Sequence, residues 1–581
     1  YAPTAATRKA RLEFVPLARG EDPRAVVVGQ GLEYRLAWVL QPRFAGSDTE
    51  WEALVDAHSG ELIAFEDKTN YASTRTLVGG VYPLANDGDG SDGTLQSYPL
   101  PFAHVTTGVG TFATDSGGNL AVCVDGSIST TLAGPYVVMS DVCGAVSEST
   151  AGAVLDLAGT VGSTPHDCTV PAGHSTGDTA SARSAFSEIN KIAEMGRGHL
   201  PNNTWLRTPL PVQVNIVDTC NASGGPAQLR FFRSGGGCTN TGEIAGVFDH
   251  EWGHGMDGAD AAPGISNPGE GIADIYASLR LNTSCIGRNF QLGDNCGGYG
   301  DPCTQCDGVR DIDYAKRSSG NPHNITFIGP ACGSGNSTPC GGSTHCEGSV
   351  YAESVWDLWN RDLIGAPFSM SLDTAREVAT RLTFTGGQLV TTWFQCTQGS
   401  GGCPATSGYM NYLAADDDDG NLANGTPHMQ AIHAAFNRHG IACSTPTVQN
   451  SGCAGAPTAA PTVTTQALDR GALVSWTAVA GADSYRVYRT EGVAGCNYGK
   501  TLIGETAGTT WTDGDGLANG RTYNYMVIAM GDGDACFGPA SACSAVAPTP
   551  AANLAIRPAA VTIFDGDGDA FLDNCESARV T

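Results

Sequence analysis

The sequence predicts an α+β protein made of several domains. Short alternating runs rich in Gly, Ser, Thr and Val dominate residues 76–180 and indicate β-structure, whereas the signals from Gly246 to about Gly440 are mainly helical. Residues 458–548 again alternate β-branched and aromatic positions between turn clusters, the pattern of a β-sandwich. A length of 581 residues, at about 150 residues per domain, agrees with three to four domains.

Residues 1–75 are expected to form a separate small α+β domain. Tyr34–Leu40 and Trp51–Val55 are predicted strands, and residues 56–60 form a turn before the partner strand Glu61–Phe65. The first 45 residues carry seven basic and four acidic side chains, whereas the whole chain has a net charge of −28. Two interpretations follow: a simple accessory domain, or a segment that docks on the acidic remainder of the chain, with Asp67–Arg75 as the candidate processing junction.

The composition excludes several classes of function. A net charge of −28 argues against general binding of nucleic acids or of anionic membranes. No run of 18 apolar residues predicts a membrane span. Twenty cysteines favour an oxidising compartment, and four close pairs flank polar loops. The chain begins at Tyr1 without Met, so we expect a removed signal peptide and secretion. The close pairs are Cys220/Cys238, Cys332/Cys340, Cys396/Cys403 and Cys443/Cys453, and the lone CxxC at Cys303/Cys306 is expected in disulfides.

The remaining boundaries follow from local pattern. Ala180–Met195 has the spacing of an amphipathic helix, Pro211–Val217 is a predicted strand, and residues 285–346 are a Cys- and Gly-rich insertion. Within the sandwich, SWTAVAGADSYRVYR resembles a fibronectin type III module, for which a spacer without a binding role is the main alternative. The expected domains are 76–245 and 246–443 as two lobes, 444–457 as a linker, 458–550 as the sandwich and 551–581 as the start of a truncated domain.

A metal site is predicted at His250-Glu251-x-x-His254. On a helix, positions i and i+4 lie on one face about 5–6 Å apart, so two imidazoles there can share one Zn²⁺. Glu251 lies beside the first ligand and can reach a metal-bound water. Sixteen residues after His254, Glu270 and Asp274 again occupy positions i and i+4. Glu270 can supply the third ligand that a catalytic zinc needs, and Asp274 can hold the other ring nitrogen of a ligating histidine.

HExxH followed by ExxxD resembles the gluzincin, or thermolysin-like, metallopeptidases. Four segments are similar to the fungalysin family in particular: HEWGHGMD (250–257), GEGIADIYA (269–277), HCEGSVYAESVWDLW (345–359) and DDDDGNLANGTPHMQAI (416–432). The resemblance covers roughly residues 76–440 and implies a thermolysin-like pair of lobes, β-rich and then helical, with zinc in the cleft between them. Residues 1–75 also resemble the propeptides of such enzymes.

The resemblance implies roles for individual residues. His250, His254 and Glu270 match the zinc ligands, Glu251 matches the general base, and Asp274 matches the acid that orients a ligand histidine. Further matches are His345 with the histidine that stabilises the oxyanion, Asn221 and Ala222 with the edge strand that holds the substrate backbone, and Val247 with the lining of the S1′ pocket. No tyrosine lies between His254 and Glu270, where thermolysin-like enzymes carry one, and no arginine is identified for the substrate carbonyl.

Acidic loops predict calcium as a structural cofactor. Asp565, Asp567, Asp569, Asp573 and Glu576 occupy positions 1, 3, 5, 9 and 12 of an EF-hand-like loop, although Ala570 replaces the usual Gly. The acid run Asp416–Asp419 and the shorter group between Asp87 and Asp92 are further candidates.

Together these patterns lead us to expect a secreted, monomeric zinc endopeptidase made as a proenzyme. Its partners are protein or peptide substrates and its own propeptide. A glycoprotein-directed HExxH peptidase and a catalytically inactive adhesion protein on a peptidase scaffold are the alternatives.

Overall fold

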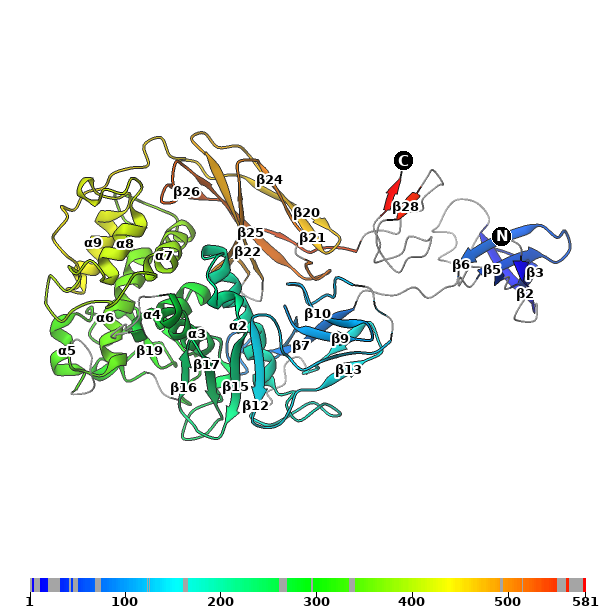
Figure 1. The fold of residues 1–581 in the computed structure, drawn as a ribbon, viewed down its shortest axis with the longest axis horizontal. Helices are drawn as coiled ribbons and strands as arrows, with labels where there is room; N and C mark the ends of the chain where they lie inside the picture. The colour runs from blue at the N-terminus through cyan, green and yellow to red at the C-terminus, as the bar shows by residue number, and fades with distance from the viewer. Residues whose placement is uncertain are drawn as a thin grey trace. The chain divides into compact units, whose positions relative to one another are not determined.

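The structure is a computed structural model in which two compact units are distinguished (Figure 1). One unit comprises Tyr1–Ser73 and Ala560–Thr581, and the other comprises Thr74–Ala559. The structure describes residues 3–4, 11–18, 32–40, 43–44, 51–67, 75–122, 124, 126–159, 166–260, 269–293, 296–333, 340–491, 495–514, 516–550, 561–563 and 578–580.

The first unit is built on a four-stranded antiparallel sheet of order β2-β3-β5-β6. The turn between β5 and β6 is closed by Asp56, whose Oδ1 accepts hydrogen bonds from the backbone N–H groups of His58 and Ser59, both at 2.9 Å. The predicted strands and turn of this unit are thus confirmed, and its described residues contain no helix. The strands are β1 (Pro3–Thr4), β2 (Arg11–Ala18), β3 (Leu32–Leu40), β4 (Arg43–Phe44), β5 (Trp51–Asp56), β6 (Leu62–Asp67), β28 (Val561–Ile563) and β29 (Ala578–Val580).

The second unit begins with β-structure, as predicted for residues 76–180. Two sheets have the orders β14-β7-β8 and β10-β9-β11-β13. A third sheet has the order β12-β15-β17-β16, in which β16 is the antiparallel edge strand. The strands are β7 (Thr76–Val81), β8 (Gln96–Pro99), β9 (His104–Thr107), β10 (Gly110–Ala113), β11 (Ile128–Thr130), β12 (Val137–Asp141), β13 (Glu148–Thr150), β14 (Val154–Asp156), β15 (Leu210–Ile216), β16 (Ala222–Gly225) and β17 (Gln228–Phe232).

Helix α2 (Ala180–His199) confirms the predicted amphipathic helix. It begins after Thr179, whose Oγ1 accepts a hydrogen bond from Ala182 N at 3.1 Å and so satisfies one of the free N–H groups of the first turn. Apolar side chains of α2 such as Phe186, Ile189 and Ile192 are buried in the main core. The helix therefore supports the third sheet, from which the edge strand β16 reaches the site described below.

A helical region follows, confirming the predicted change in pattern near Gly246. Its helices are α3 (Ala245–Asp260), α4 (Gly269–Leu281), α5 (Ile325–Ala331), α6 (Thr344–Asp357), α7 (Leu372–Gly387), α8 (Gly408–Asp416) and α9 (Met429–Arg438). The Cys- and Gly-rich insertion adds a two-stranded ladder of β18 (Cys285–Ile286) and β19 (Arg310–Asp311). Short helical turns lie at Trp205–Arg207, Thr241–Glu243, Gly298–Gly300, Tyr314–Lys316, Leu358–Asp362, Leu422–Asn424 and Gly495–Asn497.

The predicted sandwich consists of two sheets, β20-β21-β24 and β23-β22-β25-β26, with β27 paired to β25. Alternate residues of the central strand face opposite ways: Tyr525 and Val527 belong to the sandwich core, whereas Met526 and Ile528 belong to the main core of the helical region. The strands are β20 (Val463–Leu468), β21 (Gly471–Trp476), β22 (Ser484–Glu491), β23 (Thr501–Thr506), β24 (Thr510–Asp513), β25 (Tyr523–Met530), β26 (Phe537–Ala540) and β27 (Ser544–Val546).

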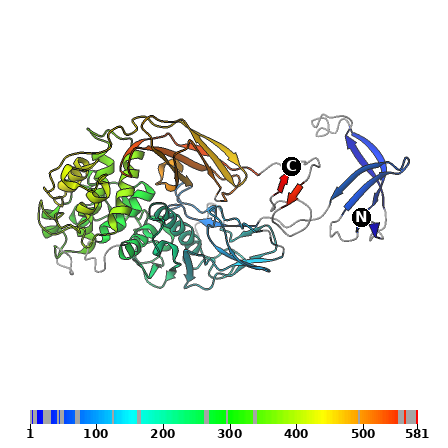
Figure 2. The same ribbon diagram turned by 45° about the horizontal axis from the view of Figure 1, so that its top comes forward.

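The sandwich shares its core with the rest of the second unit. Figures 1 and 2 show it alongside α2 and α7. Polar contacts add to the shared apolar core, because Arg489 bonds Glu194 of α2 at 2.8 Å and Ala540 N donates to Thr374 Oγ1 of α7 at 2.9 Å. The bridge Cys453–Cys536 ties the expected linker 444–457 to the sandwich. The module is therefore an integral layer of the fold.

Nine disulfides link described cysteines, which is typical of proteins from oxidising compartments. Of the four close pairs in the sequence, only Cys220–Cys238 is a bridge. The two cysteines of the CxxC are both in disulfides, although with different partners. None of the helices in the described ranges has the length and hydrophobicity that crossing a membrane requires. The other bridges are Cys143–Cys168, Cys285–Cys306, Cys296–Cys303, Cys332–Cys346, Cys340–Cys396, Cys403–Cys443, Cys453–Cys536 and Cys496–Cys543.

Helix α7 carries a buried acid that predicts a pH-dependent stability. Glu377 is fully buried, and neither carboxylate oxygen has a hydrogen-bond partner among the described residues. Burial raises the pKa of Glu377 to about 7, although Arg376 and Lys500 lower it. Because the folded-state pKa lies above the unfolded value, this acid costs nothing below about pH 4; its cost grows as the pH rises towards 7 and is fully present above that pH.

Glu377→Gln should therefore stabilise the protein at pH 8 by about 3 kcal/mol and have little effect at pH 4.5. Urea unfolding at the two pH values measures this difference. Glu61→Gln, at an exposed turn, is the control and should give equal shifts at both. A Glu377→Gln effect that is the same at pH 4.5 and pH 8 would contradict the prediction.

Candidate metal centre

Helices α3 and α4 bring three potential metal ligands together. His250 and His254 lie one turn apart on α3, with their Nε2 atoms 3.2 Å from each other. Glu270 of α4 places Oε2 at 3.2 Å from His250 Nε2 and 3.5 Å from His254 Nε2. The two helices approach closely because Gly253 has no side chain: a Cβ there would lie 2.8 Å from Ala273 Cα. The predicted ligand triad is thus a spatial cluster, with all three ligand atoms within 4.8 Å of one another.

The cluster has the properties of a cation site. Glu270 Oε2 is buried and has no hydrogen-bond partner among the described residues. Burial alone would raise the pKa of Glu270, but His250 and His254 hold it well below its usual range. Burial likewise lowers the pKa of His250, but Asp274 and Glu270 raise it to about 10. The surroundings thus favour positive charge at the point where two nitrogens and one oxygen meet, which is the donor set of a catalytic zinc. The residues present fit Zn²⁺.

Asp274 lies where the sequence predicts it. Its Oδ1 is 2.8 Å from His250 Nδ1, so it can fix the orientation of that ring. Arg310, from the insertion, donates to both oxygens of Asp274 at 2.6 and 3.0 Å and lies 3.6 Å from Glu270 Oε2. Burial alone would raise the pKa of Asp274, but Arg310 and His250 have the larger effect. The pKa of Asp274 is therefore lowered, and the acid is held as a carboxylate.

Asp274→Asn should weaken zinc binding by about 10- to 100-fold, because an amide holds the His250 ring less firmly than a carboxylate does. Competition with a fluorescent zinc chelator at pH 7.5 measures the affinity. Asp373→Asn, in the first turn of α7 with its side chain 43% exposed, serves as the control and should bind zinc as the wild type does. Equal affinities for Asp274→Asn and the wild type would show that Asp274 does not support the ligand.

Arg310 and Tyr299 are the site residues that the sequence did not reveal. Burial raises the pKa of Tyr299, while the positive charge of the nearby Arg310 lowers it. Both residues belong to the insertion, which is anchored by Cys285–Cys306 and Cys296–Cys303. No spacing rule relates them to the HExxH helix, and only the many cysteines indicated that this segment is held in one conformation.

Glu251 lies between the ligands on α3 and is buried. Burial raises its pKa, and the neighbouring His250 and His254 lower it. The edge strand β16 runs directly beside it: a Cβ at Gly224 would lie 2.1 Å from the Glu251 carbonyl oxygen. A carboxylate with this placement can exchange a proton with a group bound between the strand and the ligand cluster.

Strand β16 begins at the second residue of the predicted substrate-binding pair. Ala222 is buried and Asn221 is exposed, just before the strand begins. The disulfide Cys220–Cys238 fixes the entry to the strand. As the edge of the third sheet, β16 can accept an extended peptide by strand addition. The predicted Val247 is buried in the main core beside Gly287.

His345 reaches the cluster from the first turn of α6. Its Nε2 lies 3.3 Å from Glu270 Oε2, and its side chain is 47% exposed. Burial lowers the pKa of His345. Helices α4 and α6 pack closely at two glycines, since a Cβ at Gly271 would lie 2.6 Å from the Gly348 carbonyl oxygen. This contact brings a neutral, accessible imidazole to the ligand cluster.

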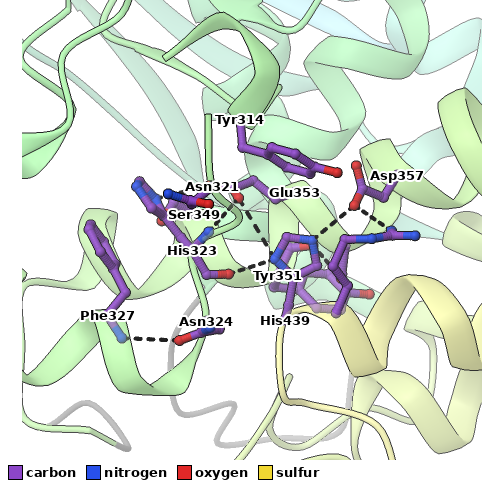
Figure 3. Close-up of polar contacts among 12 residues, drawn as sticks. Tyr314, Asn321, His323, Asn324, Phe327, Ser349, Tyr351, Glu353, Asp357 and His439 are labelled. Carbon is purple, nitrogen blue, oxygen red and sulfur yellow. Dashed lines mark hydrogen bonds and ion pairs between the residues drawn. The ribbon is translucent and has the colours of Figure 1, made fainter. Parts of the chain in front are cut away.

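A buried polar network holds α6 further along the helix (Figure 3). Ser349 Oγ lies 3.0 Å from His323 Nδ1, and Glu353 accepts a hydrogen bond from His323 N at 2.9 Å. Asp357 Oδ2 lies 3.2 Å from His439 Nε2, whose ring also bonds the His323 carbonyl oxygen through Nδ1 at 2.6 Å. Ser349, Glu353 and Asp357 follow one another at intervals of four residues and so lie on one face of α6. The network therefore fixes the rotation of the helix whose first turn carries His345.

The two acidic loops within the described residues that are candidates for calcium also have contacts with protein groups. Arg288 lies between Asp87, Asp89 and Asp92, with its closest contact, to Asp87, at 2.6 Å. In the second loop, Asp416 accepts hydrogen bonds from Thr426 and His428.

The three acids that follow Asp416, Asp417–Asp419, converge near the surface. The EF-hand-like loop 565–576, with Asp565, Asp567, Asp569, Asp573 and Glu576, lies outside the described residues, so its calcium stays a prediction.

Comparison with known proteins concerns the sandwich. No family model and no curated protein matches the sequence. A Fn3-like protein from Clostridium thermocellum is 31% identical over 17% of this chain and 99% of its own, with a TM-score of 0.14. A β-1,2-glucanase from Parabacteroides distasonis is 21% identical over 17% of this chain and 14% of its own, with a TM-score of 0.15. A pectate lyase from Pectobacterium carotovorum is 23% identical over 16% of this chain and 29% of its own, with a TM-score of 0.13.

The chain is thus a mixed α+β protein with a central helical region and a fibronectin type III-like β-sandwich. The sandwich-like domain accounts for about 17% of the chain.

Proposed function

We propose that this chain is a secreted zinc-dependent endopeptidase with thermolysin-like lobes that is made as a proenzyme. One observation carries the proposal: His250, His254 and Glu270 converge from two helices, and the buried Glu251 directly follows the first histidine on the same helix. Two imidazoles and one carboxylate are the ligand set of hydrolytic zinc sites that keep one position for water. The disulfides agree with secretion.

Each residue of the site has a separate role in the proposed hydrolysis of a peptide bond. Zinc, when bound, polarises the scissile carbonyl and makes water more acidic. The Glu251 carboxylate takes the proton of the attacking water and returns it to the leaving nitrogen, for which a pKa raised by burial is suited. His345 donates its N–H to the developing oxyanion, and such a donor contributes about 3–4 kcal/mol in other hydrolases. Asn221 and Ala222 hold the substrate backbone along β16.

Hydrolysis of casein by the processed protein tests this proposal. We expect 1,10-phenanthroline to abolish hydrolysis and added Zn²⁺ to restore it. A glycoprotein-directed peptidase would cleave mucin in preference to casein. An inactive adhesion protein would cleave neither substrate after removal of residues 1–73 and loading with zinc, and that result would refute the proposal.

The propeptide boundary belongs between residues 68 and 74. Strand β6 ends at Asp67, whereas Arg75 is buried in the second unit, where its guanidinium donates to the carbonyl oxygens of Val124, Gly126 and Ala151. The expected junction Asp67–Arg75 therefore narrows to residues 68–74, because Asp67 belongs to β6 and Arg75 to the second unit. Residues 68–74 lie outside the described residues. Mass spectrometry of the secreted product should place the mature N-terminus there.

A further inference from the structure

A second group of metal-ligating side chains lies in the β-rich part of the second unit. Glu148 is the first residue of β13, and His174 and Asp178 come from the loop that leads into α2. His174 Nδ1 lies 3.2 Å from Glu148 Oε2 and 2.7 Å from Asp178 Oδ2. All three ligand atoms are within 4.8 Å of one another. The cluster shares no residue with the His250 site.

The atoms that face each other are not satisfied by hydrogen bonds. Asp178 is fully buried, and its Oδ2 has no hydrogen-bond partner among the described residues. His174 Nδ1 is also buried and lacks one within the same described ranges. Although the two atoms are 2.7 Å apart, they do not have the alignment of a hydrogen bond. The contact is an ion pair when the ring is protonated; when the ring is neutral, the buried carboxylate oxygen and the ring nitrogen are costly unless a further group binds both.

The other oxygen of each carboxylate is held by the protein. Asp178 Oδ1 accepts a hydrogen bond from Arg183 Nη1 at 2.7 Å, and Arg183 is itself fixed to the Gly80 carbonyl oxygen at 2.8 Å. Glu148 Oε1 accepts from both the N–H and the hydroxyl of Ser175, at 2.8 and 2.6 Å. Each acid thus keeps one oxygen for His174 while the other is oriented, the support that metal-ligating carboxylates receive in proteins.

We propose that Glu148, His174 and Asp178 form a second site for a divalent transition-metal ion such as Zn²⁺. One imidazole with two carboxylates suits such ions better than calcium, which takes oxygen ligands. The site joins β13 to the residue directly before Thr179, the N-cap of α2. Bound metal would therefore fix the start of the helix that supports the sheet carrying β16, a structural role separate from hydrolysis.

Metal content of the full chain tests this site. After removal of metals with a chelator and dialysis against buffered Zn²⁺, elemental analysis should find one zinc fewer in His174→Asn than in the wild type. Glu148→Gln, which keeps an oxygen for Ser175, should lose the same zinc. His433→Asn, a half-buried histidine on α9, is the matched control and should keep every zinc. If His174→Asn fails to fold, the comparison rests on Glu148→Gln.

Thermal unfolding gives a second readout. Zn²⁺ should raise the melting temperature of His250→Asn, in which only the second site remains intact, and should not raise that of His250→Asn combined with Glu148→Gln. The proposal is overturned if Glu148→Gln holds as much zinc as the wild type, or if the two His250→Asn chains respond equally. If the wild type bound no zinc at the His250 site, the proposed hydrolysis would be refuted. The comparison of the two His250→Asn chains would still test the second site.

Discussion

Glu251→Gln is expected to fold, to bind zinc and to lose hydrolysis by about 10³-fold or more. The amide has nearly the shape of the carboxylate but cannot take a proton from water, and positioned acid–base groups contribute about 10²- to 10⁴-fold. Because Glu251 is not a ligand in the observed cluster, the triad of His250, His254 and Glu270 should remain able to bind metal. Steady-state hydrolysis of a quenched fluorescent peptide, together with zinc content, measures both effects.

A matched substitution controls for unspecific damage. Glu505→Gln, on the exposed side of β23 in the sandwich, removes a glutamate charge far in sequence from the site and should leave kcat/KM unchanged. Hydrolysis by zinc-loaded Glu251→Gln at the rate of the wild type would show that this carboxylate does not carry the proton. A variant without zinc would show instead that Glu251 contributes to the metal site.

Removal of the sandwich is expected to unfold the helical region. A chain that ends at residue 457 lacks five side chains that are buried in the main core, and it leaves Cys453 without Cys536. At about 1.5–3 kcal/mol for each buried side chain, the loss is about 10 kcal/mol, which is comparable to the whole stability of a typical domain. The five are Tyr488, Met526, Ile528, Met530 and Phe537.

A chain that ends at residue 550 is the control, because it keeps every strand of the sandwich. Near-ultraviolet circular dichroism and thermal unfolding should show native packing for this chain and not for the shorter one. A chain ending at residue 457 that melts cooperatively at the temperature of the control would show that the sandwich is an independent spacer.

The HExxH helix could be predicted because its chemistry is local. Residues four apart on one helix must share a face, so the spacing of His250 and His254 sufficed, and the same rule related Glu270 to Asp274. The meeting of the two helices was not a matter of spacing. It depends on Gly253 and on packing between segments that are distant in sequence, for which only the resemblance to known peptidases gave a basis.

Contacts between distant segments explain what the sequence did not reveal. Arg310 reaches Asp274 from a disulfide-linked insertion, and Arg288 forms an ion pair with Asp87 in the first of the acidic loops. The double-sided burial of β25 follows the same principle: its apolar run from Tyr525 to Met530 indicates a central strand, while the partner of its second face is set by tertiary packing.

The most direct test of the zinc assignment is anomalous diffraction at the zinc absorption edge from crystals of the zinc-loaded protein. The account predicts an anomalous peak about 2.0–2.2 Å from the Nε2 atoms of His250 and His254 and from a carboxylate oxygen of Glu270. Glu270 turned away from the two histidines, or no peak between them, would contradict it.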